Sequence, residues 1–360
     1  MRTRNRERRK KTQSAKHKST PADDPWSFVH PLTSEDAAAM TALRSAVAGM
    51  KGKLEGITAR APFNGIIEQV EAPEGVNFEE DAVGGISGCW AKPAETREGS
   101  AVLHLHGGWF NWGTAQAFRN LVGHIALRAG TAAFIPDYRL APEHPFPAAV
   151  KDAEACYRGL EDRGIRNIAL SGDSAGGNLA LVLLSIATAQ SASGGVLPVG
   201  AVTLSPVTDL ALSGASYETR AQADPYFLKS QAAGLVRSYL GDADPKNPLA
   251  SPLYGDLTAL PPIRVHVGDD EVLLDDSRRY VERAVAAGVD ATLDVWMGMA
   301  HGFTNSVGRM HAANQALDAI GAFLSERLAG ALQAPARAAV GSGKPKPEAR
   351  NLGVDKQHRR

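Results

Sequence analysis

The sequence has 360 residues, of which 44% are hydrophobic and 22% charged, so it can bury a full core and is not collagen-like, a coiled coil or wholly disordered. Its formal net charge is zero, but residues 1–20 hold nine Lys and Arg against one acid and residues 334–360 hold seven against two, which leaves a net charge of −13 on residues 21–333. Because an acidic body repels a phosphate backbone, we expect no nucleic-acid partner.

The two ends, residues 1–24 and 334–360, are rich in basic and small residues and poor in aliphatic ones, so we expect disordered tails. No apolar segment follows the basic start, and no stretch reaches the ~18 apolar residues of a membrane-spanning helix. We therefore expect a soluble, cytoplasmic protein without a membrane span. Cys89 and Cys156 are too few for a disulfide scaffold and are expected to be buried thiols.

The first structured element in chain order is an amphipathic helix, predicted from about residue 34 to residue 51. Thr33 or Ser34 is expected to cap it, because hydroxyl side chains accept hydrogen bonds from the first helical amides, and acidic residues occupy its first turn. An acidic turn is expected later, at residues 79–81.

Beyond this helix, short apolar segments typical of buried strands alternate with segments of helical periodicity. The expected strands are 65–71, 85–91, 101–105, 131–135, 167–170, 200–204, 263–267 and 292–295. The expected helices are 116–129, 147–162, 174–190, 275–287 and 308–329. This alternation predicts an α/β fold with a mostly parallel, eight-stranded sheet and helices on both faces.

One segment, residues 207–260, interrupts the alternation. It contains a predicted helix at 230–240 but no convincing strand, and a long excursion of this kind is usually functional. We expect residues 25–60 and 207–245 to form a helical cap over the carboxyl ends of the strands, where open α/β sheets bind ligands. Residues 25–333 would then form a single domain with its cap.

The sequence Gly172-Asp-Ser-Ala-Gly-Gly177 lies directly between a predicted strand and an apolar helix. This context is typical of a nucleophile elbow, in which small residues on both sides let the backbone turn sharply and present a strained serine. The helix N-terminus that follows favours developing negative charge. We therefore predict that Ser174 is a nucleophile.

A pair of glycines follows another predicted strand, in the sequence His106-Gly-Gly108. The amides of Gly107 and Gly108 can face a substrate oxygen together with the amide of Ala175, which predicts an oxyanion hole. His104 and His106 lie on one face of the strand, but no Cys, Asp or Glu ligand of suitable spacing adjoins them, so we expect no metal site.

A base and an acid are expected farther along the chain. A serine hydroxyl is a poor nucleophile without a base, and an imidazole base needs a carboxylate to fix its tautomer. His301 follows the last predicted strand, after an acid-rich loop that contains Asp270 and Glu271. The order serine, acid, histidine is the one that an elbow on an α/β sheet predicts. We predict His301 as the base, and the loop offers two candidates for the acid.

With these motifs, the chain resembles the hormone-sensitive-lipase family of bacterial esterases and lipases over about residues 65–330. His106-Gly-Gly108 is similar to the family's HGGG, Asp137-Tyr-Arg-Leu-Ala-Pro-Glu143 to its DYRLAPE, and Gly172–Gly177 to its GDSAGG. The resemblance implies an α/β-hydrolase that acts as a serine carboxylesterase on short- to medium-chain acyl esters, with a small-molecule substrate and no cofactor. Relatives often pair through the last strand and helix, so the resemblance also allows a homodimer.

The chain departs from the family pattern at two places. Trp109 stands where the family has its third glycine, and its bulk is expected to reshape the acyl pocket and favour small acyl groups. The family's acid commonly precedes Pro-Leu and an acidic pair, and this alignment places Glu271, with Asp270 as the alternative, at the acid position. Asp173, inside the elbow, is expected to make a structural contact or tune selectivity in the substrate pocket.

Two other functions fit the same residues. A lactonase or a deacetylase of a specific metabolite would use the same machinery, because the fold does not determine the substrate. A non-catalytic receptor for small molecules is the alternative outside enzymes, although such a protein typically lacks the nucleophile or the base.

Overall fold

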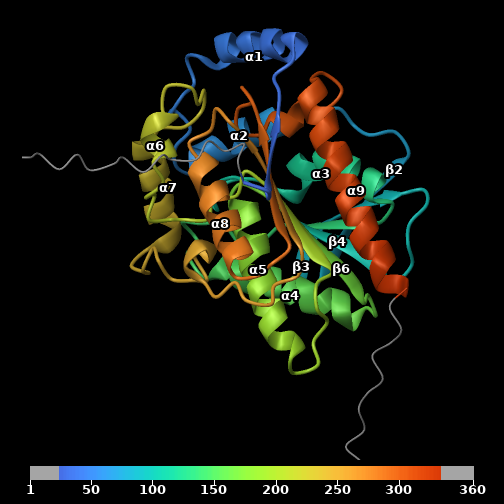
Figure 1. Ribbon diagram of the computed structural model, residues 1–360. Helices are drawn as coiled ribbons and strands as arrows, with labels where there is room; N and C mark the ends of the chain where they lie inside the picture. Colours follow the sequence, from blue (N-terminus) through green and yellow to red (C-terminus); the bar gives the residue numbers. More distant parts are fainter. Residues whose placement is uncertain (1–23, 334–360) are drawn as a thin grey trace, which may run out of the picture.

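The computed structural model describes residues 24–333, so the two predicted tails lie almost wholly outside the described residues. Nine strands form one sheet in the order β1-β9-β8-β7-β6-β4-β5-β3-β2 (Figure 1). Their bounds are β1 Ser27–His30, β2 Val76–Val83, β3 Ile86–Pro93, β4 Ser100–Leu105, β5 Ala133–Pro136, β6 Asn167–Asp173, β7 Gly200–Leu204, β8 Ile263–Gly268 and β9 Ala291–Trp296. β3 runs antiparallel to β2 and β5, and the other neighbours are parallel. The mostly parallel α/β sheet is confirmed.

Nine α-helices accompany the sheet within the described residues. Their bounds are α1 Ser34–Val47, α2 Arg60–Ile67, α3 Ala115–Ala129, α4 Ala148–Asp162, α5 Ala175–Ser191, α6 Ser216–Thr219, α7 Lys229–Leu240, α8 Leu274–Ala286 and α9 His311–Gln333. Short 3₁₀-helices lie at η2 Ile57–Ala59, η3 Pro252–Tyr254 and η4 Phe303–Ser306. The predicted helices of the body agree with α3, α4, α5, α8 and α9. Most of them have apolar residues at helical spacing, whereas α5 is a buried apolar run that follows the elbow.

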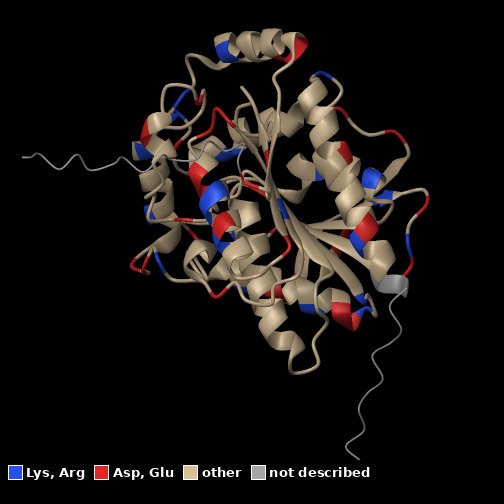
Figure 2. Cartoon of the chain, in the orientation of Figure 1, with Lys and Arg blue, Asp and Glu red and all other residues tan. Residues whose placement is uncertain are grey.

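The helices cover both faces of the sheet. Apolar side chains of α4, α5 and α8 pack in one core cluster, and those of α3 and α9 pack in a second. Figure 2 shows the charged residues mainly on helices and loops, while the central strands are largely uncharged. Strands covered on both faces lose the alternation of polar and apolar residues, which explains why β4 to β8 read as short apolar runs.

Three predicted elements at the beginning of the chain are wrong. The sheet has nine strands, not eight, and Ser27–His30, expected in the cap, pairs in parallel with β9 as an edge strand. The predicted turn at 79–81 lies inside β2, whose exposed edge position accepts acidic side chains. The predicted strand at 65–71 begins inside α2, because a short apolar run cannot distinguish a strand from a helix.

Helices α1, α2, α6 and α7 lie around the carboxyl ends of the parallel strands, with α1 at the top of Figure 1 and α6 and α7 at one side. Thr33 caps α1 by accepting a hydrogen bond from the Asp36 amide (3.1 Å). Asp36 in turn accepts the amides of His311 and Ala312 (2.8 and 3.0 Å), so that α1 caps the start of α9. These contacts fix α1 to the start of α9.

Candidate active site

Ser174 lies in the turn between β6 and α5 and is almost fully buried, with 3% of its surface exposed. Its φ angle of 55° places a non-glycine residue in the left-handed region, which costs backbone energy. A Cβ atom on Gly172 would collide with the Gly176 carbonyl, and one on Gly176 would collide with the carbonyls of Leu105 and His106. Only glycine fits at these two positions, and the sharp turn depends on having glycine at both.

His301 and Glu271 lie on the loops that follow β9 and β8. The imidazole Nδ1 is 2.8 Å from Glu271 Oε2. The other carboxylate oxygen of Glu271 accepts hydrogen bonds from the Ser205 hydroxyl (2.7 Å) and the Gly268 amide (2.6 Å). The Glu271 carboxylate is buried and held by these hydrogen bonds, so it fixes the orientation of the imidazole ring.

Asp270, the alternative acid, faces helix α1. Its carboxylate pairs with Arg44 of α1 at 2.7 Å, and its backbone amide donates to the Met299 carbonyl (3.1 Å). The structure therefore brings Glu271, and not Asp270, against the imidazole of His301.

The charges around the imidazole shift its pKa. Burial alone would lower the pKa of His301, but the charge and hydrogen bond of Glu271, together with the charges of Asp224 and Asp173, outweigh burial and raise this pKa above its ordinary value. Phe227 and His301 pack edge to face, with 5.1 Å between ring centroids and an interplanar angle of 72°. The imidazole is thus oriented by a carboxylate on one side and an aromatic ring on another.

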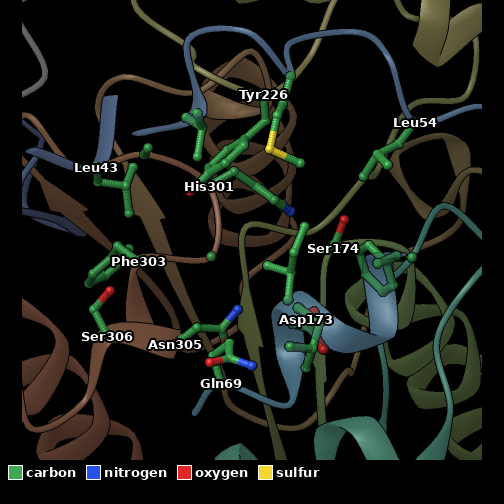
Figure 3. A pocket seen from close by; sticks show the side chains of 18 of the residues that line it. Leu43, Leu54, Gln69, Asp173, Ser174, Tyr226, His301, Phe303, Asn305 and Ser306 are labelled. Carbon is green, nitrogen blue, oxygen red and sulfur yellow. The ribbon is translucent and has the colours of Figure 1, made fainter. Parts of the chain in front are cut away.

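Ser174 and His301 line the same cavity. Figure 3 shows the hydroxyl and the imidazole pointing into the same part of it. No hydrogen bond joins the two side chains among those found in residues 24–333. Catalytic hydrogen bonds are often long or poorly aligned before substrate binds.

The two predicted oxyanion glycines differ in what their amides contact. The Gly107 amide donates to the Asp173 carboxylate (2.9 Å), so in this arrangement it does not face a substrate oxygen as predicted. For Gly108, Trp109 and Ala175, by contrast, no acceptor for the amide is found in the described part of the chain. Gly108 has a φ of 121°, and a Cβ there would collide with the Trp112 carbonyl, which explains the glycine.

Asp173 links the elbow to the loop after β4. Besides the Gly107 amide, its Oδ1 lies 3.4 Å from Nε2 of the buried His104, whose Nδ1 is 3.1 Å from the Ser171 hydroxyl. His106 contacts the Gly107 carbonyl (2.8 Å). The two strand histidines thus have separate structural partners, and no group of three His, Cys, Asp or Glu residues that could hold a metal is found in residues 24–333.

The cavity above Ser174 has a volume of about 450 Å³ and a mainly apolar wall. Its wall comes from α1, α2, the loops after β4 and β9, and the segment before α7; it includes Leu43, Phe63, Trp109, Asp173, Phe227 and Phe303. Trp109 is buried and packs edge to face on Phe227, with centroids 5.5 Å apart. Both residues predicted for the substrate pocket, Trp109 and Asp173, therefore line this cavity.

Sequence reasoning missed Ser205 and Phe227. Ser205 follows β7 and has a positive φ of 47°, and its place at the carboxyl end of a strand is a signal that could have identified it. Phe227 lies in an irregular stretch of the excursion, and no pattern in the sequence distinguishes it from other aromatic residues.

Comparison with known proteins adds a family to this geometry. The family model described as the alpha/beta hydrolase fold matches residues 102–305. An acetyl-hydrolase of Streptomyces hygroscopicus is 39% identical over 244 residues, which cover 67% of this chain and 80% of that protein. An esterase of Acinetobacter venetianus is 36% identical over 225 residues, or 62% of this chain and 73% of that protein.

Solved structures agree with these relatives. A crystal structure of an esterase from the bacterial hormone-sensitive lipase family has a TM-score of 0.76 and 36% identity, and the match covers 83% of this chain and all of that one. An esterase/lipase from an uncultured bacterium has a TM-score of 0.75 and 35% identity over the same share of both chains.

In residues 24–333, no helix is long and apolar enough to cross a membrane.

Proposed function

We propose a catalytic triad for this chain, which belongs to the bacterial hormone-sensitive-lipase family of α/β-hydrolases and is a serine carboxylesterase. In this triad Ser174 is the nucleophile, His301 the general base and Glu271 the acid. The observation that supports this assignment is the bond of 2.8 Å between Glu271 and His301 Nδ1, with Ser174 in the same cavity. Because Nδ1 faces the carboxylate, Nε2 is left for the serine proton.

In the first half of the reaction, His301 takes the proton of the Ser174 hydroxyl while its oxygen attacks the ester carbonyl. The resulting imidazolium is stabilised by the Glu271 carboxylate, and the same proton then goes to the leaving alcohol. Water, activated by His301, attacks the acyl-enzyme in the second half and releases the acid. These steps involve no cofactor.

The oxyanion of both tetrahedral intermediates would be held by the amides of Gly108, Trp109 and Ala175. This assignment replaces the Gly107 amide, which Asp173 occupies, with that of Trp109. Each such donor stabilises the transition state by about 3 kcal/mol in comparable sites. Gly107 then has a structural role, because its hydrogen bond to Asp173 fixes the loop that presents the amides of Gly108 and Trp109.

The preferred substrates would be esters of small acyl groups. Trp109 is buried beside the cavity and packed against Phe227, so its indole reduces the space near Ser174, and one of the relatives is named an acetyl-hydrolase. Rates on nitrophenyl esters from C2 to C12, with several lactones added, test this preference. We expect kcat/KM to be highest for the shortest acyl groups, whereas rapid turnover of the C12 ester would contradict it, and faster opening of a lactone would favour the lactonase.

A cytoplasmic location and a homodimer stay predictions. The last strand, β9, is already paired with β8 on one side and with β1 on the other over residues 293–296, so a dimer of this chain would have to use a surface other than the edge of β9. Light scattering on the purified protein measures the oligomeric state.

A further inference from the structure

Residues 220–227, called the cap segment below, lie between α6 and α7 and contact the loops that carry Glu271 and His301. This cap segment lies between the end of α1 and the loop that carries Glu271, and it contains Asp224, whose side chain is completely buried. The sequence offers no reason for a carboxylate at this position, but the hydrogen bonds of Asp224 explain it.

Both oxygens of the Asp224 carboxylate accept backbone hydrogen bonds. Oδ1 accepts the amides of Tyr226 (2.8 Å) and Phe227 (3.0 Å). Oδ2 accepts the amide of Val272 (3.0 Å), the residue directly after Glu271. Because all three partners are donors, an asparagine cannot replace the aspartate without turning an NH₂ group toward an N–H group.

The three amides belong to two structures that contact His301. Val272 continues the backbone of Glu271, whose carboxylate holds the imidazole. Phe227 packs edge to face on the imidazole and on Trp109. One buried carboxylate therefore fixes the backbone beside the triad acid and the backbone of the aromatic wall.

Helix α1 and the residues after it also form hydrogen bonds to the cap segment. Arg44 donates to the Ala223 carbonyl and pairs with Asp270 at 2.7 Å. Lys51 donates to the carbonyls of Ala221 and Asp224, and the Gly52 amide donates to the Tyr226 carbonyl (3.0 Å). The N-terminal cap, the cap segment and the acid loop are thus joined by consecutive hydrogen bonds.

We propose that Asp224 is a positioning residue of the esterase, which ties the cap segment to the loop of Glu271 and so holds the acid and Phe227 against His301. The proposal rests on the proposed function, because Asp224 acts through Glu271 and does not line the cavity. An error of about 1 Å in the placement of a catalytic group can cost about a hundredfold in rate. Loosening the acid loop is therefore expected to lower kcat more than it raises KM.

The charge of Asp224 gives this role a second readout. The charged groups with the largest effects on the His301 imidazole are Glu271, Asp224 and Asp173, and all three favour its protonated form. Removing the charge of Asp224 lowers the pKa of His301, so the acidic limb of the kcat/KM profile moves to lower pH. The limb would stay in place if the charge of Asp224 did not act at His301.

The experiment is a double-mutant cycle of Asp224→Asn and Glu271→Gln, measured on p-nitrophenyl acetate with the full chain. We expect Asp224→Asn alone to lower kcat about tenfold or more, with KM changed less than kcat and the acidic limb shifted down. In the Glu271→Gln background the same change should cost less than about threefold, because the group through which Asp224 acts is already impaired. Equal costs in both backgrounds, or an unmoved limb, overturn the proposal.

Two further variants keep the result interpretable. Glu218→Gln removes a charge from an exposed side chain of α6, where Glu218 pairs with Lys229, and should leave kcat and the pH profile unchanged. Where Asp224→Asn does not fold, Lys51→Met replaces it in the cycle, because it releases the same segment from the side of α1, and equal costs in both backgrounds again overturn the proposal. Failure of the proposed function looks different, since Glu271→Gln alone would then keep full activity.

Discussion

At the scale of single residues, two adjacent carboxyl groups point in opposite directions. Glu271 accepts from Ser205 and Gly268 and contacts His301, while Asp270 pairs with Arg44 of the cap. The acid-rich loop could be identified from the sequence, but which of the two acids meets the imidazole depends on how the backbone turns after β8.

Exchanging each carboxyl group for an amide separates the two roles. Glu271→Gln should lower kcat by about a thousandfold or more, because the imidazole loses its tautomer and the stabilisation of its cation. Asp270→Asn should cost at most a few-fold, since it affects only the pair with Arg44. Steady-state hydrolysis of p-nitrophenyl acetate measures both, and a larger loss in Asp270→Asn would reject Glu271 as the acid.

The pH profile follows from the raised pKa of His301. The base must be neutral to accept the serine proton, so kcat/KM should fall as pH decreases through a value above the ordinary pKa of histidine. Glu271→Gln removes the largest of the charges that raise this pKa, and the limb of its remaining activity should lie at lower pH. A limb that stays at the same pH in this variant would show that another group titrates.

At the scale of elements, the elbow and the loop after β4 form one unit through Asp173. The motifs of both could be recognised from the sequence, because each needs glycine for a reason of backbone geometry. Their connection, the bond from the Gly107 amide to Asp173, could not, since it joins residues 66 positions apart. The same limit applies to Phe227 and Asp224, which lie in irregular segments whose shape depends on contacts with distant loops.

Two substitutions of Asp173 test this connection. Asp173→Asn keeps an acceptor for the Gly107 amide, whereas Asp173→Ala removes it and frees the oxyanion loop. We expect kcat to fall about tenfold or more in the alanine variant, because a displaced donor stabilises the transition state less, and to fall less in the asparagine variant. Equal losses in the two would mean that the charge of Asp173, and not its hydrogen bond, matters.

At the scale of the whole molecule, the N-terminal residues belong to the body as well as to the cap. β1 extends the sheet beside β9, and Asp36 of α1 caps α9. The sequence predicted the α/β body well, because buried strands and amphipathic helices leave strong patterns. It did not predict β1 or β2, because a short, partly exposed edge strand and an exposed acidic edge strand have no such pattern.

Removing the carboxylate of Asp36 should destabilise the protein. Asp36→Ala leaves the first amides of α9 without acceptors, and loss of a helix cap costs about 1–2 kcal/mol. The melting temperature should fall by a few degrees. Glu35→Ala, in the same turn but exposed, serves as the control, and equal melting temperatures for the two variants would contradict the capping role.

The most direct test of the central claim is covalent labelling with a fluorophosphonate, followed by intact mass and peptide mapping. An activated serine beside a histidine base attacks such a reagent, so we expect one adduct per chain, located on Ser174 and absent from Ser174→Ala, with a much slower reaction in His301→Ala. A folded protein that remains unlabelled, or an adduct on another residue, would contradict the assignment of Ser174 and His301.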